Sequence, residues 1–263
     1  MNPAMVFLRG GGLGDFILTL PLIQLAHQKN HRVYLYARSS YLKLLGEEWD
    51  WLKIRDLDQL SGMAPNEAKD NVVISFWRDV GWSKEMMDAG ALNSIMLDPR
   101  PLEGPSFLNQ ASMNLGWSLP ENFRLQPFLG ERWNQQNRTL WIHPGSGGNE
   151  KNLPLKSFIF RAHQWLETAS NQRVIFSFGE ADEPLWQKFT LDEISRHPRV
   201  SITRPSSVYD FKKQMGKHAV KFLGNDSGPG HLAANLGIPV EIYFLSTSES
   251  VWTPTGPNVI THN

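Results

Sequence analysis

Three glycine-rich turns lie between an apolar, strand-like run and a helical pattern, and they constrain the fold more than any other feature of the sequence. They span residues 10–15, 144–148 and 224–229. In open α/β sheets, ligands bind outside the carboxyl ends of the strands, where turns of this kind lie. The helix that follows such a turn presents unpaired N–H groups and the positive end of its dipole. We therefore expect an α/β fold with candidate anion sites at these turns.

The rest of the chain alternates in the same way. Short, continuous apolar runs favour buried parallel strands. The predicted strands cover residues 4–8, 32–37, 51–54, 71–77, 94–97, 139–143, 173–178, 200–203, 219–223 and 240–244. The predicted helices cover residues 16–27, 40–45, 107–116, 149–168, 183–196, 208–217 and 231–236. This alternation predicts β-α-β units in doubly wound parallel sheets.

A polar segment divides the chain. Residues 117–137 are punctuated by Pro120, Pro127 and Gly130, and the strand-helix alternation restarts after them. The chain has 263 residues, and domains of roughly 150 residues are typical, so two small domains fit this length. We expect a boundary near residue 136, with domains at 1–136 and 137–263.

Composition excludes several classes of function. The 26 basic and 26 acidic side chains cancel, whereas a general nucleic-acid binder needs surplus positive charge. Cysteine is absent, which removes disulfides, thiolate metal sites and a cysteine nucleophile. The longest apolar stretch near the N-terminus, residues 16–26, is shorter than the roughly 20 residues of a spanning helix. No signal peptide precedes it, so we predict a cytoplasmic protein.

The first turn departs from the dinucleotide-binding fingerprint. Counting from Gly10 and Gly12, the third glycine falls at position 15, which is an aspartate. The second predicted strand ends in Ala37-Arg38 and lacks the acidic residue that would hold a ribose. Two roles remain open for Asp15. It caps the helix that follows, or it acts as a general base toward a nearby hydroxyl.

Lys151 follows the second turn closely. A flexible ammonium group behind a glycine loop suits a diphosphate whose negative charge develops during a reaction. The alternative is a solvated loop lysine. His143 ends the strand before this turn, and we interpret it as a buried strand-end histidine rather than a ligand.

The third turn reads Asp226-Ser227-Gly228-Pro229, and it combines N-cap residue types with a proline at the start of a helix. Pyrophosphate oxygens could accept hydrogen bonds from the N–H groups of Ser227 and Gly228, with His231 nearby. The alternative is a well-capped structural helix. The Asp-x-Asp pattern at residues 56–58 is interpreted as a solvated turn, and we expect no metal site.

Together the three turns resemble glycosyltransferase family 9, the ADP-heptose:lipopolysaccharide heptosyltransferases. The similar segments are residues 12–21, residues 142–148 with 151–154, and residues 225–234 with 237–240. The resemblance implies a GT-B fold, in which two Rossmann-like domains face each other across a cleft. The N-terminal domain of the family takes the acceptor, and the C-terminal domain takes the nucleotide-sugar.

The resemblance also implies roles for individual residues. Asp15 is similar in position to the base that deprotonates the acceptor hydroxyl, and Lys151 to the lysine that binds the donor phosphates. Asp226, Ser227, Gly228 and His231 match the donor-binding turn. The expected ligand-lining set is completed by Gly12, Gly14, Ser146 and Gly147. Members of the family invert the anomeric centre without the Asp-x-Asp metal, and no cofactor is expected.

We therefore expect an inverting, metal-independent glycosyltransferase that moves a sugar, heptose from ADP-heptose first of all, to an acceptor hydroxyl. The acceptor is a carbohydrate or glycolipid of the lipopolysaccharide core or another bacterial glycan, reached through peripheral contact with the inner membrane. No nucleic-acid partner is expected.

Three alternatives stand beside this expectation. A non-catalytic nucleotide-sugar-binding or partner-binding module is suggested because family members continue further beyond residues 252–256. Residues 99–137 also lack the basic cluster expected for a phosphorylated lipid core. A nucleotide-sugar hydrolase or epimerase using the same site is the second alternative. The third alternative is an oxidoreductase, which is disfavoured because the first turn departs from the dinucleotide-binding fingerprint.

Overall fold

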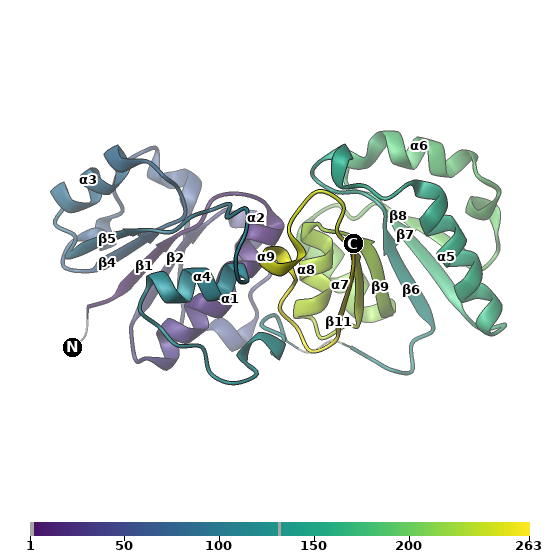
Figure 1. Ribbon diagram of the computed structural model, residues 1–263, viewed down its shortest axis with the longest axis horizontal. Helices are drawn as coiled ribbons and strands as arrows, with labels where there is room; N and C mark the ends of the chain where they lie inside the picture. The colour runs from purple at the N-terminus through teal and green to yellow at the C-terminus, as the bar shows by residue number, and fades with distance from the viewer. Residues whose placement is uncertain (1–2, 131–132) are drawn as a thin grey trace. The chain divides into compact units, whose positions relative to one another are not determined.

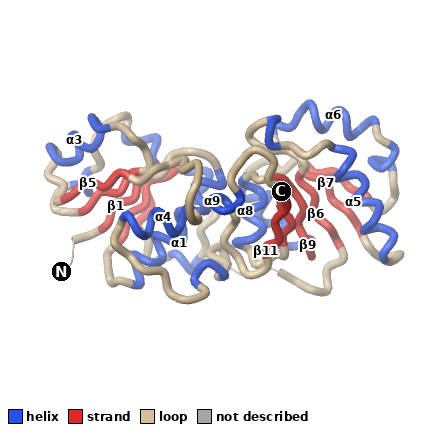
Figure 2. Tube along the Cα trace, in the orientation of Figure 1, coloured by secondary structure: helices blue, strands red, loops and turns tan. Residues whose placement is uncertain are grey.

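The computed structural model describes residues 3–130 and 133–263 of the chain. The chain divides into two compact units, Met1–Phe123 and Arg124–Asn263. Within each unit the strands lie side by side with helices packed against them (Figures 1 and 2). In the described part of the chain, no helix combines the length and the hydropathy needed to cross a bilayer.

The first unit contains a five-stranded sheet in which all paired strands are parallel. Its strands are β1 (Met5–Leu8), β2 (Val33–Ala37), β3 (Lys53–Asp56), β4 (Val72–Ser75) and β5 (Asn93–Met96). Their order, β3-β2-β1-β4-β5, changes direction between β1 and β4. Every residue of β1 is buried, as its continuous apolar run predicts. The first glycine turn follows β1, so it lies at the topological switch point where ligands bind in such sheets.

Helices pack against this sheet. They are α1 (Leu13–Gln28), α2 (Ser39–Leu42), α3 (Val80–Asp88) and α4 (Phe107–Asn114). The central part of α1 is buried on all sides, because α1 packs against both the sheet and α4. An apolar face all round the helix is what such burial requires.

The second unit contains a six-stranded parallel sheet with the order β11-β10-β9-β6-β7-β8. Its strands are β6 (Thr139–His143), β7 (Arg173–Ser177), β8 (Val200–Thr203), β9 (Ala219–Asn225), β10 (Val240–Tyr243) and β11 (Val259–His262). Its helices are α5 (Leu155–Thr168), α6 (Glu183–Leu191), α7 (Val208–His218), α8 (Gly228–Asn235) and α9 (Glu249–Trp252). The order changes direction between β6 and β9, which pair with each other. The second and third glycine turns therefore leave the sheet from neighbouring strands at its switch point.

The division between the units lies earlier than the sequence predicts. Leu129 donates its main-chain N–H to the carbonyl of Asn235 at 3.0 Å, and the Trp133 indole N–H reaches the carbonyl of Val220 at 2.9 Å. The described residues between 124 and 136 therefore belong with the second unit and not with the first. Proline and polar content marked this segment correctly as lacking strands and long helices, but could not show where it packs. Residues 131 and 132 of the predicted linker lie outside the described residues.

Several helix boundaries also differ from the prediction. The helix expected over residues 183–196 ends at Leu191, because Asp192 is extended and its carboxylate accepts the N–H of Ile194 to start a short 3-10 turn. The helix expected from residue 231 begins at Gly228, which places Pro229 in its first turn. The sequence did not predict α3, α9 or β11.

Candidate functional site

Asp15 sits in the first turn of α1, and its carboxylate has two protein partners. The main-chain N–H of Gly12, the N-cap residue, donates to Oδ2 at 2.7 Å. Nη2 of Arg9 donates to Oδ1 at 2.9 Å. The structure thus gives Asp15 the capping role considered for it, but from the third helical position instead of the N-cap. Its side chain is 25% exposed, so the carboxylate remains open to solvent on one side.

Arg9 was not among the residues that the sequence singled out. It ends the buried run of β1 and is itself only 2% exposed. Its guanidinium carbon lies 4.4 Å from the ring centre of Phe76 and 5.3 Å from that of Phe107. Burial lowers the pKa of Arg9 to about 10, while the charge of Asp15 works in the opposite direction. The available signal was a lone arginine between a buried strand and a glycine cluster.

Gly11 is the glycine that the first turn requires. Its φ is +93°, and an added Cβ would lie 2.4 Å from Oδ2 of Asp15. A side chain at this position would therefore be strained and would also displace the carboxylate. Gly12 commits its N–H to Asp15, and Gly14 is the second residue of α1.

The structure brings the second and third turns together. Nζ of Lys151 lies 3.5 Å from Oδ2 of Asp226. Asn225 joins the same two turns, since its amide nitrogen donates to the carbonyl of Pro144 at 2.8 Å and its amide oxygen accepts the N–H of Leu153 at 3.0 Å. The ammonium and the start of α8 consequently belong to one site at the switch point of the second sheet.

Asp226 is buried and anchors this site. Its Oδ2 accepts the hydroxyl of Thr247 at 2.6 Å, and its Oδ1 lies 3.7 Å from Nε2 of His231. Burial acts to raise the pKa of the Asp226 carboxyl, but His231, Thr247 and Lys151 together hold that pKa below its ordinary value. The carboxylate is thus ionised at neutral pH and is satisfied by protein groups.

The start of α8 carries polar groups without protein partners. In the described part of the chain, no acceptor receives the main-chain N–H of Ser227 or Gly228. Ser227 is the N-cap but makes no side-chain cap, and its buried Oγ lacks a partner within residues 3–130 and 133–263. Nδ1 of the buried His231 is unpartnered in the same sense. Unsatisfied buried polar atoms are rare in native proteins, and the helix start favours an anion.

The contacts of Ser146 and Gly147 give no indication of a ligand-binding role. The Ser146 hydroxyl donates to the carbonyl of Gly148 at 2.7 Å, so it stabilises its own turn. A Cβ on Gly147 would meet no atom within 4 Å. Neither residue is required at its position by its contacts within the described chain.

His143 belongs to a buried network beside this site. Its Nδ1 lies 3.1 Å from the Ser177 hydroxyl, and its Nε2 lies 3.4 Å from Oδ2 of Asp182. Burial lowers the pKa of His143, although Asp182 acts to raise it. A Cβ on Gly145 would lie 1.8 Å from Oδ1 of Asp182. The interpretation of His143 as a buried strand-end residue agrees with this geometry, and Asp182 is a contributor that the sequence did not reveal.

The Asp-x-Asp pattern closes a local turn. Oδ1 of Asp56 accepts the main-chain N–H of Asp58 at 3.1 Å, where a short 3-10 helix follows β3. Among the described residues, no group of three or more histidine, aspartate or glutamate side chains is arranged to hold a metal ion.

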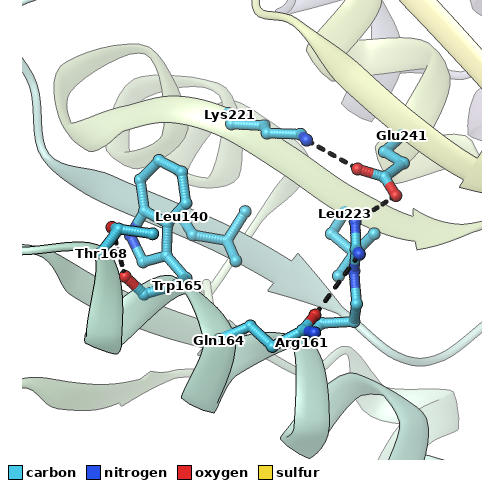
Figure 3. Close-up of a pocket in the computed structure, with 8 residues that line it drawn as sticks. All are labelled: Leu140, Arg161, Gln164, Trp165, Thr168, Lys221, Leu223 and Glu241. Carbon is cyan, nitrogen blue, oxygen red and sulfur yellow. Dashed lines mark hydrogen bonds and ion pairs between the residues drawn. The ribbon is translucent and has the colours of Figure 1, made fainter.

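A pocket in the second unit is lined by residues outside the glycine turns (Figure 3). Residues of α5 and of the neighbouring strands line it: Leu140, Arg161, Gln164, Trp165, Thr168, Lys221, Leu223 and Glu241. Glu241 is 4% exposed and pairs with Arg161, with Lys221 at 2.6 Å and with His262 at 3.0 Å. Burial acts to raise the pKa of Glu241, but these cations hold it below its ordinary value. The cations therefore have a protein counter-ion.

Two doubly wound parallel sheets, with an anion-attracting helix start at the switch point of the second, define a two-unit Rossmann-like α/β protein. The sequence model of glycosyltransferase family 9 (heptosyltransferase) matches residues 111–262, more than half of the chain. The chain therefore belongs to glycosyltransferase family 9 and is a glycosyltransferase. A search of curated protein sequences finds no significant match.

Solved structures at low sequence identity have the same fold. A family 9 glycosyl transferase from Veillonella parvula superposes with a TM-score of 0.72 at 17% identity, covering 100% of this chain and 88% of its own. The E. coli ADP-heptose lipopolysaccharide heptosyltransferase II gives 0.71 at 12% identity, covering 98% and 90%. E. coli heptosyltransferase WaaC with ADP gives 0.68 at 12% identity, covering 98% and 92%. The predicted GT-B fold class is confirmed.

Proposed function

We propose that this protein transfers a sugar from a nucleoside-diphosphate donor to an acceptor hydroxyl, with inversion at the anomeric carbon and without a metal ion. The observation that carries the proposal is the start of α8. There, among the described residues, the N–H groups of Ser227 and Gly228 and Nδ1 of the buried His231 have no protein partner, and the Lys151 ammonium pairs with Asp226 of the same turn. Donors and positive charge concentrated at a helix start favour a diphosphate.

ADP-heptose is the donor we propose. The structures with the same fold include WaaC bound to ADP and, at a TM-score of 0.66 and 14% identity, WaaC bound to ADP-2-deoxy-2-fluoro heptose. Those ligands belong to those proteins. They support the choice for this chain because the family match extends to residue 262 and so includes the Lys151 and α8 turns.

In the proposed reaction, Asp15 accepts the proton of the acceptor hydroxyl. The acceptor oxygen then forms a bond to the anomeric carbon on the face opposite the diphosphate. The bond from that carbon to the diphosphate oxygen breaks, and its electron pair leaves on the nucleoside diphosphate. Lys151 and the N–H groups of Ser227 and Gly228 offset the charge that develops on this leaving group.

The use of the acidic groups supports the proposed metal independence. Asp226, a carboxylate beside the proposed phosphate site, is already engaged by Thr247 and by the Lys151 ammonium. Asp56 is used in a local turn. In this proposal, the Lys151 ammonium and the α8 dipole supply the positive charge for which other transferases use a divalent cation.

We also propose that the first unit binds the acceptor and the second binds the donor. The acceptor is a carbohydrate or glycolipid of the lipopolysaccharide core or another bacterial glycan. The reaction takes place in the cytoplasm, with peripheral contact to the inner membrane. Asp15 in the first unit and the α8 site in the second are the features that support this division of roles.

Calorimetry with ADP and ADP-heptose, followed by a turnover assay with acceptor glycans, tests the proposal. A ligand that binds only the folded protein raises the free energy of unfolding of that protein by about 2.7 kcal/mol when the ligand is at a hundredfold excess over its Kd. We expect ADP binding in magnesium-free buffer and acceptor-dependent release of ADP. Donor binding without turnover on any acceptor would indicate a non-catalytic module, and release of free sugar without acceptor would indicate a hydrolase.

A further inference from the structure

We propose that Arg9 is the positioning residue of the transfer reaction, holding the Asp15 carboxylate in a fixed orientation. This inference rests on the proposed function of Asp15 as the base, and it adds a residue that the reaction has so far not required. Arg9 touches neither donor nor acceptor in this account, because it is almost fully buried. It acts through Asp15.

Arg9 makes two hydrogen bonds to Asp15. Nε donates to the main-chain carbonyl of Asp15 at 2.9 Å, and Nη2 donates to Oδ1 of the same residue at 2.9 Å. A planar guanidinium can make both bonds at once, whereas the ammonium of a lysine is a single point of charge. The two hydrogen bonds therefore fix both the start of α1 and the direction in which the carboxylate points.

The surroundings keep the guanidinium in place. Phe76 and Phe107 flank it, and their rings stack with centres 6.0 Å apart. The other charge that acts on Arg9 is Arg100, which is a cation, so Asp15 is the carboxylate that balances this buried group. Because a buried charge must be paired, Arg9 and Asp15 are held together.

The hydrogen bonds from Arg9 leave Asp15 able to accept a proton. A carboxylate offers about four lone-pair positions, and the Arg9 and Gly12 bonds use two of them. The exposed quarter of the side chain gives an acceptor hydroxyl access to a remaining position.

The test compares Arg9→Met, Arg9→Lys and the control Arg55→Met. Arg55 pairs with Glu67 in the same unit but is half exposed. In Arg9→Met we expect kcat to fall by up to about 100-fold while the KM for the donor stays unchanged, because the carboxylate loses its fixed direction whereas the proposed donor site lies on the second unit. In Arg9→Lys we expect a smaller loss of kcat, about tenfold, because the charge is retained but the planar pair of donors is lost. Arg55→Met should leave kcat and KM unchanged.

Crystal structures of the wild type and the variants give a second measurement that needs neither donor nor acceptor. We expect the Asp15 carboxylate to keep its position in the wild type and in Arg55→Met, and to lose it in Arg9→Met. If Arg9→Met does not fold, the Arg9→Lys variant still separates charge from geometry, and equal kcat in Arg9→Lys and wild type would overturn the proposal. An unchanged kcat and an unchanged Asp15 position in a folded Arg9→Met would also overturn it. A wild-type protein without turnover would instead refute the proposed function, while the crystal structures would still report the effect of Arg9 on Asp15.

Discussion

Lys151 and Asp226 form an ion pair of 3.5 Å that joins the turn after β6 to the turn after β9. Asp226 is buried, whereas the Lys151 side chain is 30% exposed. The carboxylate thus holds the ammonium at the edge of the site without enclosing it. Thr247 and His231 also face Asp226, so the carboxylate keeps protein partners in the proposed state in which Lys151 contacts a phosphate.

Removing the charge of Lys151 should weaken donor binding without unfolding the second unit. In Lys151→Met we expect the Kd for ADP to rise about 10- to 100-fold, which corresponds to the roughly 1.5–3 kcal/mol of a hydrogen bond to a charged group. Isothermal calorimetry measures the change, and Lys188→Met, an exposed lysine on α6, is the matched control. Equal ADP affinity in Lys151→Met and wild type would remove Lys151 from the donor site.

Replacing Asp15 by asparagine should abolish proton transfer. We expect kcat to fall by about 10²–10⁴, the usual contribution of a general base, while donor affinity stays the same because the proposed donor site lies on the second unit. Asp79→Asn is the control, since Asp79 caps α3 in the first unit through the N–H groups of Gly81 and Trp82. Asparagine can retain such a cap, so any loss specific to position 15 concerns the charge of the carboxylate. A folded Asp15→Asn protein with near-normal kcat contradicts the assignment.

The alternation of apolar runs predicted both parallel sheets, because burial on both faces leaves a continuous apolar run in β1 and in the middle of β6. The edge strand β11 was missed, since none of the residues Val259–His262 is fully buried and the strand ends in two polar residues. The sequence also singled out Lys151 and the α8 turn, which the structure brings together, while their role in donor binding stays a prediction. It could not place Arg9 against Asp15, or Asp182 against Gly145, because those contacts depend on how the turns pack and not on local composition.

A comparison of Gly11 with Gly62 separates the cost of adding a side chain at the first turn into a backbone part and a contact part. Both have positive φ, +93° and +79°, but a Cβ on Gly62 meets no atom within 4 Å, whereas one on Gly11 meets Oδ2 of Asp15. Gly62→Ala should cost only the backbone term, roughly 1–2 kcal/mol. Gly11→Ala should cost more and should also reduce kcat, because the clash moves the carboxylate. Urea denaturation and turnover measure the two effects. Equal stability and full activity in the two variants would show that Asp15 can move aside freely.

The ion cluster around Glu241 gives a prediction about pH (Figure 3). Its pKa is held below the ordinary value, although burial opposes this, because Lys221, Arg161 and His262 surround the carboxylate. A carboxylate whose folded pKa is depressed stabilises the protein above its unfolded pKa of about 4.3. That stabilisation is lost as the pH falls through the folded pKa, because the unfolded state binds the proton first.

Glu241→Gln should therefore destabilise the protein at pH 7 and matter progressively less in acid. At pH 7 we expect a loss of about 1–3 kcal/mol, below the full cost of breaking a buried pair because Arg161 and Lys221 are about one-third exposed. The difference from wild type should shrink between pH 5 and pH 3, as measured by urea denaturation at each pH. Glu183→Gln, which breaks the exposed pair with Arg204 at 2.8 Å, is the control and should cost at most about 1 kcal/mol. A difference between wild type and Glu241→Gln that stays constant with pH would mean that packing of the side chain, and not its charge, stabilises the sheet here.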